Sequence, residues 1–311
     1  MMNDDAVAPV IAVMLILAAA VTVLSVWNAV YIPSLKQSSE IEHLRSVESS
    51  FLRFSSDLGD AVSSRQDSFT RSEPVQLGGG DCIFNTLRSG GSLFVQEEPE
   101  PVYSLTLYDE GLNPVSQVNG TLVNISYEPV GNFWQDQGYR WQRGFVNVTK
   151  HRTLESPLDY STMDDVNNEF NGTASLGMFA RSFGSADYTQ NQSAVSGNCS
   201  RIVLNAVRLS VSPDHPFASG NGYGSLKIIP RVNTTRFDRI AAVSVNSDRS
   251  LFGNATLEGW NSSLAAGALA CSGTVGYVPQ PEEDRRYYTI GDGKEPLDLI
   301  LNNAAIEIGA Y

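Results

Sequence analysis

The side chains that most often carry catalysis or bind metals are few and scattered in this sequence. Its three histidines are His43, His151 and His215, and no pair of them has the spacing of metal ligands. Single histidines at such positions usually face solvent or bond locally. The motifs H-E-x-x-H, G-x-S-x-G, S-x-x-K and G-x-x-x-x-G-K-[ST] are absent. We therefore expect no enzymatic activity, no catalytic residue and no bound cofactor.

Two further patterns are weak candidates for ion or phosphate binding. Acidic residues between Asp159 and Glu169 resemble a calcium loop, but they lack its glycine and its alternating ligand spacing. The glycine cluster Gly220–Gly224 leads into an expected strand, and a phosphate cradle needs a helix behind it. We interpret the first as an ordinary acidic loop and the second as a turn.

An aromatic run from Phe133 to Trp141 suggests carbohydrate binding, since flat rings and amides suit the faces of sugars. The alternative is that Trp134, Tyr139 and Trp141 point inward and anchor a pair of strands. We favour the inward orientation.

Cysteines and potential glycosylation sites indicate the compartment. A disulfide would leave one of the three cysteines unpaired, and we favour Cys199 with Cys271 over a bond to Cys82; three free thiols remain the alternative. Sequons of the form N-x-[ST] number nine, where composition alone gives about three. This excess of sequons indicates a glycosylated outer surface. The alternative is that a chain rich in Asn, Ser and Thr contains this many sequons by chance. The sequon asparagines are Asn119, Asn124, Asn147, Asn171, Asn191, Asn198, Asn233, Asn254 and Asn261.

The N-terminal segment has the length and composition of a membrane helix. No charged residue occurs between Asp5 and Lys36, and residues 6–32 are apolar on nearly all sides. A secretory signal peptide usually has basic residues before a shorter apolar run, and a buried core helix is rarely this long. We expect a membrane-inserted helix with the head outside the cell.

The helical pattern continues beyond Pro33 with a single apolar stripe. The stripe residues are spaced three or four apart, which is typical of an amphipathic helix. They are Ile41, Leu44, Val47, Phe51, Phe54, Leu58 and Val62. Pro33 lacks a backbone donor and is expected to kink the helix without ending it.

Residues 4–15 (DDAVAPVIAVML) resemble the N-terminal motif of archaeal type IV pilins, in which a polar leader ends in Gly or Ala before V-S-P-V-[IV]-G-V. Other segments resemble a related group of archaeal cell-surface proteins of unknown function. These are Ile32-Pro33, Glu40–His43, Val47, Phe51, Val75–Gly79 and Ser89–Val95.

The resemblance implies leader cleavage between Ala6 and Val7, followed by packing of the helices into a filament core. The core residues would be Val10, Val13, Leu15, Leu17, Val21 and Leu24. The partners implied are further copies of the chain in a helical homopolymer, the membrane before assembly, and covalent N-glycans.

The rest of the chain is expected to form a flexible neck and a β-rich head. Residues 66–81 contain Pro74 and three glycines, which predicts the neck. The head, residues 82–311, is predicted as one or two antiparallel sandwiches, with a poor helical pattern only around Tyr160–Phe170. Its expected strands are Ser92–Gln96, Val102–Tyr108, Thr121–Tyr127, Arg143–Thr149, Ala174–Phe179, Ile202–Val211, Ser225–Val232, Ile240–Asn246, Gly273–Val278 and Ala304–Ala310.

Composition excludes two classes of protein. An apolar content of 42% argues against a disordered chain. With 21 basic and 34 acidic residues and a net charge of −13, the chain is not suited to bind nucleic acid. From the helical and strand patterns we expect an α+β protein, in which a long N-terminal helix is followed by a mainly antiparallel β-sandwich head. The resemblance to archaeal type IV pilins implies that this helix is pilin-like and covers residues 7–65, after a possible leader, 1–6. Its expected function is that of a structural subunit of a surface filament. The alternatives are a single membrane-anchored glycoprotein acting as an adhesin or envelope component and, more remotely, an extracellular hydrolase.

Overall fold

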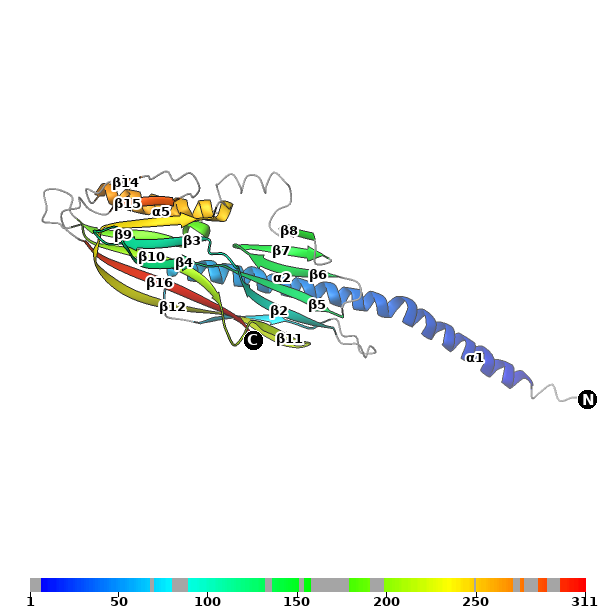
Figure 1. Ribbon diagram of the computed structural model, residues 1–311. Helices are drawn as coiled ribbons and strands as arrows, with labels where there is room; N and C mark the ends of the chain where they lie inside the picture. Colours follow the sequence, from blue (N-terminus) through cyan, green and yellow to red (C-terminus); the bar gives the residue numbers. More distant parts are fainter. Residues whose placement is uncertain are drawn as a thin grey trace, which may run out of the picture.

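The structure is a computed structural model in which a long helical rod enters a head built of three β-sheets (Figure 1). The fold class is α+β, as the sequence predicts. The residues described are 7–67, 70–79, 89–131, 136–150, 154–157, 179–190, 199–248, 250–270, 275–276, 285–289 and 297–311.

The rod consists of three consecutive helical segments. Helix α1 (Val7–Val26) is followed by a π-helical turn, η2 (Trp27–Tyr31), and then by α2 (Ile32–Ser64). In the turn, the N–H of Ile32 bonds to the carbonyl of Trp27, five residues back. Pro33 follows directly and has no N–H to offer, and such widened turns are a known source of helix bending. The helix continues past Pro33, as predicted.

Helix α2 carries the apolar stripe into the centre of the head. It contacts strands of two different sheets, so that its apolar face is covered from both sides. Leu44, Val47, Phe51, Phe54 and Leu58 are buried. The opposite face, which includes Arg45, Leu52 and Asp60, stays exposed. The predicted stripe is therefore the core of the head.

Helix α2 ends at a residue in the left-handed conformation. Arg65 has φ 50°, and its backbone N–H bonds to the carbonyl of Ala61. Its guanidinium then donates to Ser185 Oγ (2.7 Å) and to the carbonyl of Ser182 (3.0 Å). The end of the helix is thus tied to β9 (Gly184–Gln190) and the turn before it.

The strands form three sheets, named here A, B and C. Sheet A has the spatial order β1 (Arg71–Gln76), β12 (Tyr223–Ile240), β16 (Leu297–Ala310), β10 (Cys199–Val211) and β9. Sheet B has the order β11 (Phe217–Gly220), β2 (Gly90–Glu97), β5 (Val123–Val130), β6 (Gln137–Gln142), β7 (Phe145–Lys150) and β8 (Leu154–Pro157). Sheet C has the order β14 (Val275–Gly276), β15 (Arg285–Thr289), β13 (Ala242–Ser247), β3 (Tyr103–Tyr108) and β4 (Pro114–Gly120).

Strand pairing is largely antiparallel, as expected. Among the described strands, β10 and β16 pair in parallel, and the other pairs are antiparallel. Buried apolar residues of the three sheets and both head helices form one cluster. Eight predicted strands overlap β2, β3, β5, β7, β10, β12, β13 and β16. The run at 273–278 is described only at β14, and the run at 174–179 lies almost entirely outside the described residues.

Two elements differ from the sequence prediction. Helix α5 (Leu251–Ala270) covers part of sheets A and C, where no helix was expected. Strand β1 lies within the predicted flexible neck and pairs with β12 from Arg71 to Gln76. Pro74 is tolerated there because β1 is an edge strand of sheet A. The helical pattern expected at 160–170 lies outside the described residues.

The aromatic run that ends at Trp141 points inward where it is described. Tyr139 and Trp141 are buried against α2, with Phe51 and Phe54 as ring neighbours, each at a centroid distance of 6.1 Å. Trp141 Nε1 donates to Ser55 Oγ (3.0 Å). The preference for inward anchors is confirmed for these two residues, and Trp134 lies outside the described residues.

Candidate functional site

The first candidate surface is the part of the rod that stands clear of the head (Figure 1). The residues predicted to form a filament core all lie on it, and each side chain is between 53% and 66% exposed. They are Val10, Val13, Leu15, Leu17, Val21 and Leu24. The helix is long and apolar enough to cross a membrane, and an N-terminal secretion signal would pass the same test. Val7 opens α1, and Ala6 lies outside the described residues.

The second candidate site lies where the rod enters the head. Glu40 is the first fully buried residue of α2, and His43, one turn later, is 3% exposed. Burial of a carboxyl and an imidazole is costly unless each is bonded or neutral. We call Glu40, His43 and the residues packed on them the basal cluster.

His43 joins the rod to β1, the first strand of sheet A, by a hydrogen bond. Its Nε2 lies 2.8 Å from the carbonyl oxygen of Gln76 on β1, and its ring meets the edge of Tyr127 from β5 at 6.1 Å. A carbonyl accepts only, so Nε2 carries the proton in this geometry. Nδ1 is buried and has no hydrogen-bond partner within the described part of the chain. Burial lowers the pKa of His43, against the opposing effects of the Gln76 carbonyl and Glu40.

Glycines and one tyrosine complete the basal cluster. A Cβ on Gly79 would lie 2.7 Å from the His43 ring, and a Cβ on Gly91 would lie 2.4 Å from Tyr127. The Tyr127 hydroxyl donates to the carbonyl of Leu77 (3.0 Å). Three sequence segments that resemble the archaeal surface-protein group, 40–43, 75–79 and 89–95, therefore meet at this point.

Sequence reasoning did not predict the basal cluster, because polar residues on a helix usually mark its solvent face. His43 was expected to face solvent or to bond locally, and it is instead buried and bonds to Gln76, 33 residues further along the chain. The available signal was the glycine pairs Gly78-Gly79 and Gly90-Gly91, which are needed where backbone approaches another group closely.

The basal cluster contains one carboxyl and one imidazole that could serve as metal ligands. Among the described residues, no group of three or more His, Cys, Asp or Glu side chains could hold a metal ion.

The other predicted chemical positions are not brought to this site. His215 stacks on Tyr311 at 3.8 Å, and His151 lies outside the described residues, as does the acidic segment 159–169. Gly220–Gly224 forms the turn between β11 and β12, which confirms the interpretation as a turn. Cys199 begins β10, whereas Cys82 and Cys271 lie outside the described residues, so the disulfide stays a prediction.

Six of the nine sequon asparagines lie in described segments of the head. Asn119, Asn233 and Asn254 are exposed, whereas Asn124, Asn147 and Asn261 are half-buried. Asn171, Asn191 and Asn198 lie outside the described residues. The exposed positions are on β4, β12 and α5, so the accessible sequons are spread over the head.

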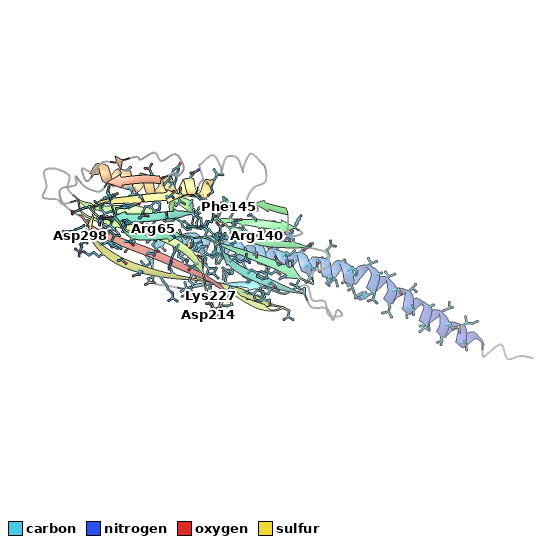
Figure 2. All side chains as sticks on the ribbon, in the orientation of Figure 1. Arg65, Arg140, Phe145, Asp214, Lys227 and Asp298 are labelled. Carbon is cyan, nitrogen blue, oxygen red and sulfur yellow. The ribbon has the colours of Figure 1, made fainter. Side chains whose placement is uncertain are left out.

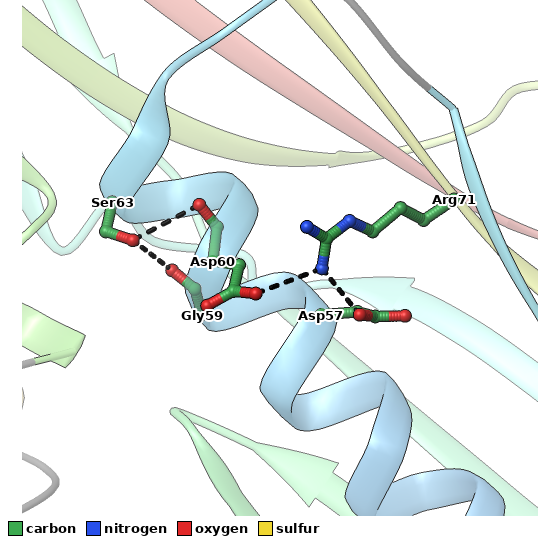
Figure 3. Close-up of polar contacts among 5 residues, drawn as sticks. All are labelled: Asp57, Gly59, Asp60, Ser63 and Arg71. Atoms are coloured by element: carbon green, nitrogen blue, oxygen red, sulfur yellow. Dashed lines mark hydrogen bonds and ion pairs between the residues drawn. The ribbon is translucent and has the colours of Figure 1, made fainter.

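Ion pairs fasten β1 to the exposed side of α2 (Figure 3). Arg71 Nη1 contacts Asp57 Oδ1 at 2.5 Å and Asp60 Oδ2 at 3.2 Å. Arg53 on α2 contacts Glu73 on β1 at 2.6 Å. Strand β1, within the segment expected to be a flexible neck, is therefore held to sheet A by backbone pairing with β12 and to the rod by these charged contacts.

Comparison with known proteins adds no identification. No family model, no curated protein and no solved structure matches the chain. The architecture itself, a long apolar N-terminal helix followed by β-rich sheets, is consistent with a pilin-like protein.

Proposed function

We propose that this protein is a non-enzymatic structural subunit of a type IV pilus-like filament on an archaeal cell surface. The observation that carries the proposal is the continuity of one helix through two environments. Its N-terminal part is apolar on nearly all sides and stands free, and its C-terminal part is the core of the head. A pull on the head is therefore transmitted directly to the rod.

The length of the free rod also supports assembly. Residues 7–39 precede the first fully buried residue and span roughly 50 Å at 1.5 Å per residue. A bilayer core needs only about 30 Å. The apolar side chains on this rod are each worth roughly 1.5 to 3 kcal/mol when removed from water. Lipid or neighbouring copies must cover them, and a helical array of copies covers every side.

In this proposal the subunit is first inserted in the membrane. Its leader is then cleaved between Ala6 and Val7, and the subunit joins the filament. Successive copies make head-to-tail contacts that do not close into a ring, so the assembly grows as a helix. The heads lie outside the cell and carry N-glycans. The second candidate function is a single membrane-anchored surface glycoprotein, which the apolar length of α1 supports equally well.

Replacement of Leu15 by Asp separates the two functions. A carboxylate in the middle of the rod has no partner in a packed filament core, whereas a single acidic residue in a long apolar helix still permits membrane insertion at a cost of about 3 kcal/mol. We expect Leu15→Asp to abolish filaments sheared from cells while the protein stays in the membrane fraction. The observation would be made by negative-stain microscopy with mass spectrometry of the filament and its N-terminal residue.

Leu112→Asp is the matched control. Leu112 is 60% exposed in the β3–β4 turn with φ 59°, a conformation that Asp tolerates well. This variant should assemble normally. Normal filaments from Leu15→Asp would exclude the packed core. Wild-type protein that stays in the membrane and never enters a filament would favour the anchored glycoprotein.

A further inference from the structure

The turn between β11 and β12 carries the chain from sheet B to sheet A. β11 pairs with β2 in sheet B, whereas β12 pairs with β1 and β16 in sheet A. Asn221 and Gly222 are the two residues between the strands, and both are exposed. Figure 2 labels Asp214 and Lys227, which precede and follow the turn, at the lower edge of the head. The turn is therefore a short, exposed link between two sheets.

An asparagine that is followed by a glycine loses its side-chain amide without an enzyme. The backbone nitrogen of the glycine attacks Cγ of the asparagine, a C–N bond forms, and the amide nitrogen leaves as ammonia with the proton of the attacking N–H. Water then opens the resulting succinimide ring at either of its two carbonyls. The products are aspartate and isoaspartate, in which the backbone runs through Cβ and Cγ. Glycine favours the attack because no side chain shields its nitrogen.

The sequence distinguishes Asn221 from the other asparagines of this kind. Asn-Gly pairs begin at Asn119, Asn171 and Asn221. Threonine follows the first two pairs, so both belong to sequons, and a glycan on the amide nitrogen prevents its departure as ammonia. Tyr223 follows the third pair, which is not a sequon. Asn221 therefore keeps a free amide even on a fully glycosylated chain.

The structure protects the pair at Asn119 in a second way. Gly120 is a buried residue of β4, and a Cβ on it would collide with the ring of Tyr103, so this ring covers the glycine. The side-chain oxygen of Asn119 accepts a hydrogen bond from Gln117 Nε2 (3.3 Å). The reacting groups are therefore covered at the glycine and bonded at the asparagine.

The surroundings of Gly222 are open by comparison. A Cβ built on this glycine would meet no atom of the described chain within 4 Å. Its N–H donates to no backbone carbonyl among the described residues. Reaction requires the attacking nitrogen and the carbon to approach within about 3 to 3.5 Å, and nothing in the described part of the chain obstructs that approach.

The carbonyl of Gly222 holds the segment that follows β1. It accepts hydrogen bonds from the N–H groups of Leu77 (2.8 Å) and Gly78 (3.3 Å). Gly78 lies so close to the turn that a Cβ on it would collide with the backbone of Asn221. Isoaspartate adds a methylene group to the backbone at this position, and tightly packed atoms leave no room for it. The segment adjoins the basal cluster, where the rod enters the head.

We propose that Asn221 is a site of spontaneous deamidation, and that its conversion to isoaspartate releases the segment after β1 from this turn. The modified turn gains one negative charge, and the carbonyl of Gly222 is displaced from its two donors. The N–H groups of Leu77 and Gly78 then lose their acceptor beside the basal cluster. The inference concerns the head alone and does not depend on filament assembly.

Incubation of the purified, full-length protein in detergent at pH 8 tests the chemical step. Digestion at acidic pH preserves the products, and mass spectrometry of the peptide that contains Asn221 detects the gain of about 1 Da. Enzymatic methylation of the new carboxyl group distinguishes isoaspartate from aspartate. We expect modification at Asn221 to be roughly tenfold faster than at Asn119, with isoaspartate as the main product.

Two glycine variants of the same turn provide the comparison. Gly222→Ala should slow modification of Asn221 by roughly tenfold, because a methyl group shields the attacking nitrogen. The fold accommodates this methyl group, which meets no described atom within 4 Å, and the φ of Gly222 is not positive. Gly220→Ala is the matched control, since its Cβ would come no closer than 4.0 Å to a described atom, and it should leave the rate unchanged. If Gly222→Ala fails to fold, Asn221→Gln replaces it, because glutamine must close a less favourable, larger ring.

Thermal melting after the incubation tests the structural step. Aged wild-type protein should melt roughly 2 to 4 °C lower than fresh protein, whereas aged Gly222→Ala should melt like its own fresh sample. Asn221→Asp introduces the charge without the extra methylene group and should melt close to fresh wild type. Three results would overturn the proposal: an unmodified Asn221, an equal rate in Gly222→Ala, or isoaspartate-rich protein that melts like fresh protein. None of them bears on the Leu15 experiment, which tests the filament.

Discussion

His43 on the rod bonds through Nε2 to the backbone carbonyl of Gln76, 2.8 Å away on the first strand of the head. This contact joins the two parts of the molecule at the level where the rod becomes buried. It also fixes the tautomer of the ring and leaves Nδ1 as the nitrogen that would take up a second proton. We therefore expect the junction between rod and head to be sensitive to acid.

The first prediction concerns this acid sensitivity. The folded-state pKa of His43 lies below its unfolded value of about 6.5. The unfolded chain therefore binds a proton first as pH falls, and the head loses stability by up to about 1.4 kcal/mol per pH unit below 6.5. His43→Gln removes this proton uptake. In this variant the free energy of unfolding, measured with urea between pH 8 and pH 5, should fall less steeply as the pH is lowered. At pH 8 the wild-type protein shows no such loss. If the free energy of unfolding falls equally with pH in both proteins, His43 is not the group responsible for the loss of stability in acid.

The second prediction concerns the close approach at Gly79. Gly79→Ala would place a methyl group 2.7 Å from the imidazole of His43 and should lower the free energy of unfolding by about 1 to 3 kcal/mol. Gly59→Ala is the matched control, because its Cβ meets nothing within 4 Å on α2. That change should raise stability by up to about 1 kcal/mol. The double variant His43→Ala, Gly79→Ala should show coupling, since the ring that clashes is gone; simple additivity would contradict the contact.

The third prediction distinguishes a core helix from a tether. Phe54 is fully buried against Trp141, so Phe54→Ala should cost about 3 to 5 kcal/mol of unfolding free energy. Leu52 is two residues away and 37% exposed, and Leu52→Ala should cost less than about 1 kcal/mol. Thermal melting of both variants provides the comparison. Equal melting temperatures would mean that the head folds without α2.

The fourth prediction concerns the ion pairs between β1 and α2. Arg71 contacts the carboxylates of Asp57 and Asp60, but these three side chains are between 26% and 65% exposed. Arg71→Ala should therefore cost at most about 1 kcal/mol, and the loss should shrink in 1 M salt, where the screening length is about 3 Å. Arg45→Ala, on the exposed side of the same helix, serves as the control. A loss that persists undiminished in high salt would point to packing by the arginine stem instead of charge.

The sequence predicted the elements whose pattern is periodic. The stripe from Leu44 to Val62 identified the buried face of α2 correctly, since spacing alone determines which side of a helix is apolar. Alternating runs likewise located most central strands. The basal cluster was missed because Glu40 and His43 are polar, and their burial depends on partners that are far away in the chain.

Helix α5 was missed for a different reason. Its three glycines lower helix propensity, which argues against a helix when the sequence is read alone. In the fold, Gly253 and Gly259 lie where a Cβ would collide with Asp248 and with the backbone of Arg181. Tertiary contact therefore overrides local helix propensity.

Strand β1 was also missed, because a segment that contains Pro74 is typical of a loop until its pairing with β12 at the sheet edge is known.

The place of β16 in sheet A has a consequence for biogenesis. This strand, residues 297–310, inserts between β12 and β10 and is the last described element to leave the ribosome. Until it arrives, sheet A is split in two and the apolar stripe of α2 has lost part of its cover. The rod at the other end of the chain is by then long since synthesised. The head therefore completes sheet A only after the rod has been synthesised, and until then the nascent chain exposes apolar surface of the kind that makes folding intermediates prone to aggregate.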